Sequence, residues 1–177
     1  MKSDVRPLCP GRWSHSGRER PHVHVGAMVS GSRTTGTGAI HRVGRAGFAD
    51  LENTGVPLRS LSSDRIRITD RGIDVVEGHL SRFTRPDGTP FGSNTAMLSD
   101  LRRIARGEIQ ATKVHRDYYA HELREFVRFR VRGFEAGMPH PSIYRNAHYA
   151  TLKEYGIPFD NHADYLLTPR AQSMLFK

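Results

Sequence analysis

Cysteine is almost absent from this sequence: Cys9 is the only one among 177 residues. A single cysteine excludes disulfide frameworks, clusters of thiolate metal ligands and paired redox cysteines within the chain. Glycine, proline and arginine surround Cys9, so the sequence offers no packed pocket in which it would act as a nucleophile. We therefore do not expect Cys9 to carry the chemistry of this chain.

Long apolar runs are also missing. The longest stretch, residues 23–29, is interrupted by His24 and Gly26 and is far shorter than the ~18 residues that a membrane-spanning helix needs. The first 25 residues scatter four arginines among proline, glycine and serine, without the continuous apolar core of a signal peptide. We therefore expect neither a membrane span nor conventional secretion.

Lysine is scarce, since 4 of the 27 basic residues are lysines and 23 are arginines. With 18 acidic residues, the chain has a net charge of +9. Arginine binds phosphate in a bidentate manner, so this bias suits phosphate recognition, although a genome that favours arginine codons explains it equally well. Residues 1–60 carry 9 basic and 4 acidic residues, and residues 61–177 carry 18 and 14. Nucleic-acid binding by the second part would therefore depend on where individual arginines lie.

Two parts of the chain differ in character. Residues 1–60 hold 9 of the 17 glycines and show no sustained hydrophobic period, which predicts a disordered or loosely ordered leader with at most a weak strand at residues 22–25. Residues 61–177 predict one compact helical domain. Its alternating segment 65–69 is typical of a short strand. Four helices are predicted after it: from Thr69 to before Pro86, from Ser93 or Asn94 to Gly107, from His115 to Arg132, and from Pro141 to Gly156. We predict a mainly α, small α+β fold of about four helices and one or two short strands.

The third predicted helix places a carboxylate where an apolar side chain is expected. On a helical wheel, Glu122 falls between Phe126 and Phe129 within a broad apolar arc, together with Arg130. A buried carboxylate needs a partner or a raised pKa, so Glu122 is a candidate for proton transfer. The alternative is a structural carboxylate that pairs with an arginine.

The opposite side of the same helix is expected to face solvent. His121 projects there together with other polar side chains, most of them ordinary solvated charges. Among them, we consider His121 an alternate catalytic candidate. The other residues on this side are His115, Arg124, Glu125, Arg128 and Arg132.

The fourth predicted helix carries a histidine on its apolar stripe. Tyr144, His148, Leu152 and Tyr155 recur at helical spacing. Alone, His148 is more typical of a core histidine bound to a tyrosine or a carbonyl. If the third and fourth helices are antiparallel neighbours, however, they bring Glu122 and His148 together.

Metal chemistry has weaker support in the sequence. Residues 121–125 place Glu125 where the zinc-protease motif has its second histidine, so that motif is not matched. A site made of His121, Glu125, His148 and His162 is an open alternative without a recognisable spacing. No phosphate-binding glycine loop or nucleophile elbow is present. We therefore expect chemistry without a metal or other cofactor.

Several short segments between Ile68 and Gly156 resemble the C-terminal toxin modules of bacterial polymorphic toxins of the Rhs-repeat and contact-dependent-inhibition kind. This resemblance covers about half of the chain. Its pieces are Ile68-Thr-Asp-Arg-Gly-Ile73, His79-Leu-Ser-Arg-Phe83, Asn94 through Ile109, Tyr119-Ala-His-Glu-Leu-Arg-Glu-Phe126, Gly133 to Pro139, Asn146-Ala-His-Tyr-Ala-Thr-Leu152 and Glu154-Tyr-Gly156.

The resemblance implies a toxin, and such toxin tips are often nucleases. It implies action in the cytoplasm of a producing or target bacterium, RNA or DNA as substrate, and a cognate immunity protein of acidic character. We expect RNA cleavage by Glu122 and His148, with His121 as the alternate. The residues expected to bind substrate are Arg124, Arg145, Asn146, Tyr119 and Tyr144.

Two other functions stay open. In an NAD-dependent ADP-ribosyltransferase toxin, Glu122 would stabilise a glycosyl cation. A non-catalytic helical module would bind nucleic acid or protein and would show salt-sensitive binding without turnover.

Overall fold

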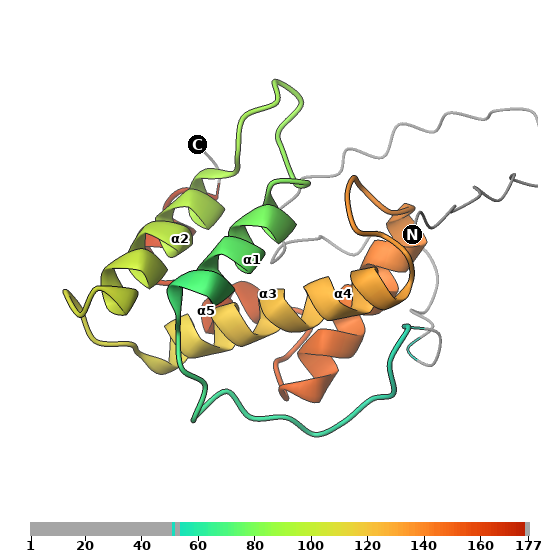
Figure 1. Cartoon of the computed structure of the whole chain (residues 1–177), viewed down its shortest axis with the longest axis horizontal. Helices are drawn as coiled ribbons and strands as arrows, with labels where there is room; N and C mark the ends of the chain where they lie inside the picture. Colours follow the sequence, from blue (N-terminus) through green and yellow to red (C-terminus); the bar gives the residue numbers. More distant parts are fainter. Residues whose placement is uncertain (1–50, 52–53, 176–177) are drawn as a thin grey trace, which may run out of the picture. The chain divides into compact units, whose positions relative to one another are not determined.

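The part of the chain described by the computed structural model, residue 51 and residues 54–175, is built from helices (Figure 1). Within these residues the fold is mainly α, as predicted, and strand-like pairing is limited to one isolated bridge between Thr84 and Pro90. The helices are α1 (Asp70–Leu80), α2 (Gly92–Ala105), α3 (Lys113–Val131), α4 (Pro141–Glu154), α5 (His162–Leu166) and α6 (Pro169–Gln172).

The helices begin and end where the sequence supplies caps. The side chain of Thr69 accepts a hydrogen bond from the backbone of Gly72 (3.2 Å) and so caps α1, as predicted. At the start of α3, the backbone N–H of Thr112 donates to Nδ1 of His115 (3.1 Å). Gly133 follows α3 with a positive φ of 81°, which lets the chain turn out of the helix.

Helix α3 lies at the centre of the packing. It contacts α1, α2, α4 and α5, while α6 packs on α2. The core between the helices contains Ile73 and Val76 of α1, Met97 and Leu101 of α2, and Leu152 of α4, each with no exposed surface. Helix α3 adds Tyr118 and Phe129 to this core, also without exposed surface.

Three features differ from the prediction. The first helix, predicted to continue to the residue before Pro86, ends at Leu80. Residues 65–69 form no strand, because the described residues offer them no strand partner; Ile68 is nevertheless buried in the helical core. The two short C-terminal helices, α5 and α6, were not predicted, because four or five residues are too few for a helical period to show.

Most of the predicted leader, residues 1–50 and 52–53, lies outside the described residues, and so does the weak strand at residues 22–25. Its final part is described, and there the backbone N–H of Arg59 donates to Glu154 Oε1 (3.1 Å). Within the described part of the chain, no helix is both long enough and apolar enough to cross a membrane.

Candidate functional site

Five ionisable side chains from three helices meet in the core. We call them the polar cluster, and each is at most 1% exposed. Moving so many ionisable groups out of water is costly unless they bind one another or a ligand. The members are His79 of α1, His121, Glu122 and Glu125 of α3, and His148 of α4.

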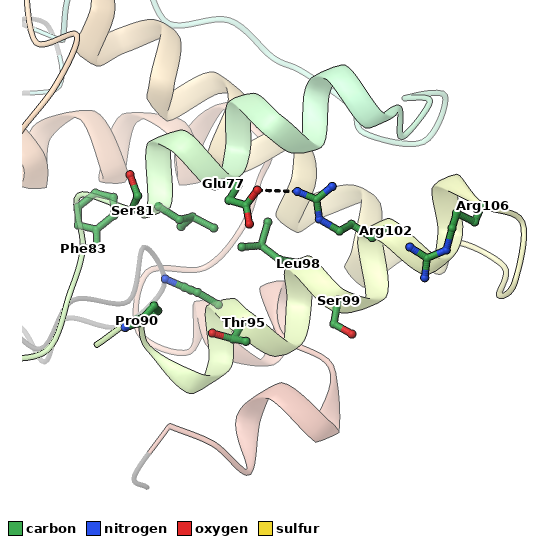
Figure 2. A pocket seen from close by; sticks show the side chains of 11 residues that line it. Glu77, Ser81, Phe83, Pro90, Thr95, Leu98, Ser99, Arg102 and Arg106 are labelled. Carbon is green, nitrogen blue, oxygen red and sulfur yellow. Dashed lines mark hydrogen bonds and ion pairs between the residues drawn. The ribbon is translucent and has the colours of Figure 1, made fainter. Parts of the chain in front are cut away.

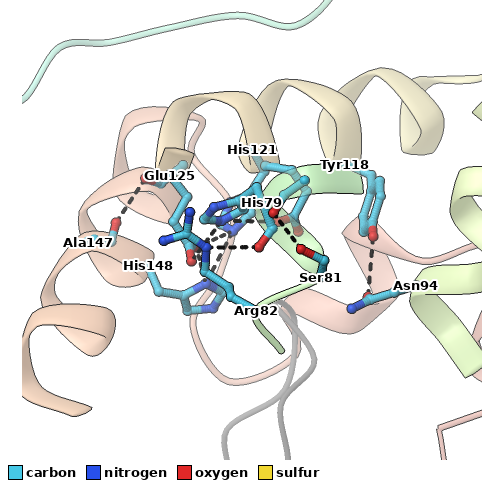
Figure 3. A network of polar contacts seen from close by, with 12 residues as sticks. His79, Ser81, Arg82, Asn94, Tyr118, His121, Glu125, Ala147 and His148 are labelled. Atoms are coloured by element: carbon cyan, nitrogen blue, oxygen red, sulfur yellow. Dashed lines mark hydrogen bonds and ion pairs between the residues drawn. The ribbon is translucent and has the colours of Figure 1, made fainter. Parts of the chain in front are cut away.

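One half of the polar cluster is a triangle of donor atoms (Figure 3). Glu125 Oε2 lies 3.0 Å from His148 Nδ1 and 3.3 Å from His121 Nε2. The two ring nitrogens are 3.2 Å apart. His121 and Glu125 are four residues apart and therefore share one face of α3, against which α4 places His148. These three side chains, which we call the triad, could hold a metal ion, because their donor atoms lie within 4.8 Å of one another.

The other half of the polar cluster joins α1 to α3. His79 Nε2 lies 3.5 Å from Glu125 Oε1 and 3.8 Å from Glu122 Oε2. The two oxygens of Glu125 therefore face different histidines. Glu122 has no hydrogen-bond partner at either carboxylate oxygen.

The two glutamates have pKa values displaced in opposite directions. Burial, helped by the negative charge of Glu125, raises the pKa of Glu122 well above its ordinary value. Burial also acts to raise the pKa of Glu125, but its contacts with the cluster histidines outweigh this effect and hold that pKa well below its ordinary value. Burial lowers the pKa of His148, although Glu125 acts in the opposite direction.

Aromatic rings surround the polar cluster. Tyr144 stacks on His148 with ring centroids 5.6 Å apart, and the ring of His162 lies 5.2 Å from that of His148. The rings of Phe83 and Phe129 form edge-to-face contacts with the ring of His79, with ring centroids 5.4 and 5.2 Å apart. This apolar wall lowers the local dielectric and strengthens every electrostatic interaction inside it.

Comparison with family models, curated proteins and solved structures found no match for this chain.

The structure brings together only some of the predicted site residues. Glu122, His121, His148 and Tyr144 all lie in or against the polar cluster, although His148 contacts Glu125 and not Glu122. Arg124 is instead paired with Glu154, with Nε and Nη2 both 2.7 Å from the carboxylate.

The remaining predicted binding residues lie elsewhere on α3 and α4. The hydroxyl of Tyr119 lies 3.5 Å from Thr69 Oγ1 under the start of α1. Arg145 and Asn146 are partly buried on α4.

The prediction that the side of α3 carrying His121 faces solvent is wrong. His121, Glu125 and Arg128 are completely buried, whereas Val127 and Val131, two apolar residues of the same helix, are 38% and 56% exposed. Hydrophobic periodicity assumes that polar side chains face water. Here the polar side chains face one another, so the buried face of α3 has the sequence pattern of a solvent-exposed face.

His79 is the cluster member that sequence reasoning missed. Its position carried a signal, because it comes three residues after the buried Val76 and directly before Leu80, and therefore lies on the apolar stripe of α1.

Proposed function

We propose that this chain is an enzyme that cleaves the phosphodiester backbone of RNA, and that the polar cluster is its active centre. One observation carries the proposal: Glu122 is completely buried, yet neither of its carboxylate oxygens has a hydrogen-bond partner. Stability alone would favour an apolar side chain at this position. Positions that break the rules of stable packing in this way are typical of functional sites.

RNA cleavage requires two proton transfers. The ribose 2′-hydroxyl loses a proton as its oxygen attacks phosphorus, and the 5′-oxygen gains one as its bond to phosphorus breaks. We assign these transfers to Glu122 and His79, because His79 is the imidazole in contact with Glu122 (3.8 Å). The products would be a 2′,3′-cyclic phosphate and a free 5′-hydroxyl. His121 and His148 belong to the same centre through Glu125.

The choice of RNA rests on the resemblance to toxin modules and on the arginine-rich composition. Of the two arginines expected to bind phosphate, Arg124 is engaged by Glu154, and Arg145 stays a predicted phosphate-binding residue. Residues 61–177 carry 18 basic and 14 acidic residues, a net charge of +4, so binding of RNA or of an acidic immunity protein would depend on individual arginines and not on bulk charge.

A cavity of about 580 Å³ beside the polar cluster supports access for a substrate. It lies between α1 and α2, with Phe83 at one end and Arg106 at the other (Figure 2). The ring of Phe83, which lines the cavity, also packs against His79 of the polar cluster. Single-stranded RNA presents unstacked bases that fit such partly apolar cavities.

The proposal is tested with the full chain and total bacterial RNA, with and without added divalent ions, followed by gel analysis of the fragments. We expect cleavage by the unaltered protein and a loss of about 10²–10⁴-fold in rate for Glu122→Gln, which keeps the shape of the side chain but cannot transfer a proton. Glu135→Gln is the matched control, because Glu135 is exposed in the loop before α4. Circular dichroism checks that both variants fold.

Two results would contradict the proposal in different ways. RNA that stays intact with the unaltered protein would reject the activity. Undiminished cleavage by Glu122→Gln would reject this active centre. Labelling of a substrate with NAD, measured in parallel, would instead favour the transferase alternative.

A further inference from the structure

We propose that the triad, His121, Glu125 and His148, binds one divalent transition-metal ion such as Zn²⁺. This inference deepens the proposed function, because the triad belongs to the same polar cluster. It rests on three observations: the spacing of the donor atoms, the conflict between their hydrogens, and the charge buried around them.

The spacing of the triad fits metal coordination. In a tetrahedral zinc site, with metal–ligand distances of about 2.0–2.1 Å, neighbouring donor atoms are ~3.3 Å apart. The corresponding separations in the triad are 3.0, 3.2 and 3.3 Å. An ion ~2.05 Å from all three atoms would lie roughly 0.9 Å out of their plane, which leaves one side free for a fourth ligand.

Hydrogen bonds among the three atoms conflict with one another. If both ring nitrogens, which are 3.2 Å apart, donate to the ionised carboxylate of Glu125, their two hydrogens converge on the single oxygen Oε2. If only one of them donates, the lone pair of the other faces the carboxylate lone pairs. A cation removes the conflict, because all three atoms then direct lone pairs at it.

The charge of the polar cluster also favours a bound cation. Glu122 and Glu125 are both completely buried, and within the described residues their ion pairs are formed with histidines and not with lysine or arginine. The ionised carboxylate of Glu125 places a negative charge in the core, where unpaired charge is most costly. A divalent cation held by Glu125 compensates that charge.

The donor types select the class of ion. Imidazole nitrogens suit zinc, iron, copper and nickel, whereas magnesium and calcium prefer oxygen ligands only. Two histidines and one glutamate, with a fourth position left open, are a ligand set that catalytic zinc sites use. Such an ion would polarise a phosphoryl oxygen, while Glu122 and His79 remain available for proton transfer.

Binding is measured directly and without RNA. The full chain is freed of metal with a chelator and titrated with ZnCl₂ by isothermal calorimetry. We expect one Zn²⁺ per chain, and we expect His148→Ala and Glu125→Gln each to weaken binding by at least ~10–100-fold, the loss caused by removing even an outer-shell partner. His140→Ala is the matched control, because His140 is an exposed histidine at the start of the same helix and should leave binding unchanged.

A second measurement needs no variant. Co²⁺ added to the unaltered metal-free protein should give the visible absorption bands of tetrahedral cobalt, and Zn²⁺ should abolish them. Failure of the unaltered protein to bind Zn²⁺ or Co²⁺ would overturn the inference, as would unchanged binding by both ligand variants. RNA cleavage that persists in the chelated protein would overturn the catalytic role of the ion but leave the proposed nuclease activity in place.

Discussion

Glu154, at the end of α4, binds two arginines of α3 through one carboxylate. It accepts hydrogen bonds from Arg124, and its Oε2 lies 2.8 Å from Nη2 of Arg128, whose side chain has no exposed surface. Removing one partner of a buried ion pair leaves the other charge uncompensated. We therefore expect Glu154→Gln to lower the free energy of unfolding by about 3–5 kcal/mol. Urea denaturation at neutral pH measures this loss, and Glu108→Gln, which removes an exposed ion pair, should have a much smaller effect.

The same residue gives a prediction about pH. Burial acts to raise the pKa of Glu154, but the hydrogen bonds from Arg124 and Arg128 outweigh it and lower the pKa below its ordinary value. A carboxylate with a lowered folded-state pKa stabilises the fold above its unfolded pKa of about 4.3, and this contribution disappears as pH falls through the folded pKa. The stability difference between the unaltered protein and Glu154→Gln should thus be complete near neutral pH and shrink below about pH 4. A difference that stayed constant through acid pH would contradict this assignment.

At the scale of elements, two glycines of α1 have opposite surroundings. A Cβ on Gly72 would lie 1.6 Å from the hydroxyl oxygen of Tyr119 and 2.7 Å from its Cζ, whereas a Cβ on Gly78 would meet nothing within 4 Å. We expect Gly78→Ala to stabilise the protein by about 0.5–1 kcal/mol, because alanine favours the helix. Gly72→Ala should instead cost about 1–3 kcal/mol, because the buried Tyr119 cannot move freely. Thermal denaturation of both variants measures these changes in stability. Equal changes for the two variants would show that α1 and α3 are packed less closely around Gly72.

The helices were largely predictable because their signals are local. Thr69, Pro141 and the glycines after α2, α3 and α4 mark helix ends through backbone chemistry that neighbouring residues determine. The polar cluster was only partly predictable. Glu122 was found because it interrupts an apolar arc, and His148 because it lies on an apolar stripe.

His121 and Glu125 were placed in solvent for a physical reason. A polar side chain that is satisfied by other polar side chains has the same sequence pattern as one satisfied by water. Only the packing of α1 and α4 against α3 shows which of the two applies. Periodicity alone therefore locates a buried polar centre only where its residues interrupt apolar ones.

At the scale of the whole described fold, the segment before α1 is part of the packing. Nη1 of the buried Arg128 donates to the backbone oxygens of Thr54 (3.4 Å) and Val56 (3.0 Å) and to the hydroxyl of Thr54. The backbone N–H of Leu61 donates to the carbonyl of Glu154 (2.8 Å). Residues 54–61 therefore connect to α3 and α4, the two helices that supply the triad.

This arrangement predicts how the chain responds to truncation. A chain that begins at residue 51 keeps all of these hydrogen bonds, whereas one that begins at residue 62 leaves the Nη1 donors of Arg128 unpaired in the core. Each buried polar group left unpaired costs about 1–3 kcal/mol, and more if it is charged. We expect the shorter chain to be less stable by at least about 3 kcal/mol in urea denaturation. Equal stability of the two chains would mean that Arg128 finds new partners once the segment is removed. If the chain that begins at residue 62 loses Zn²⁺ binding and the chain that begins at residue 51 keeps it, the segment also holds the triad in place.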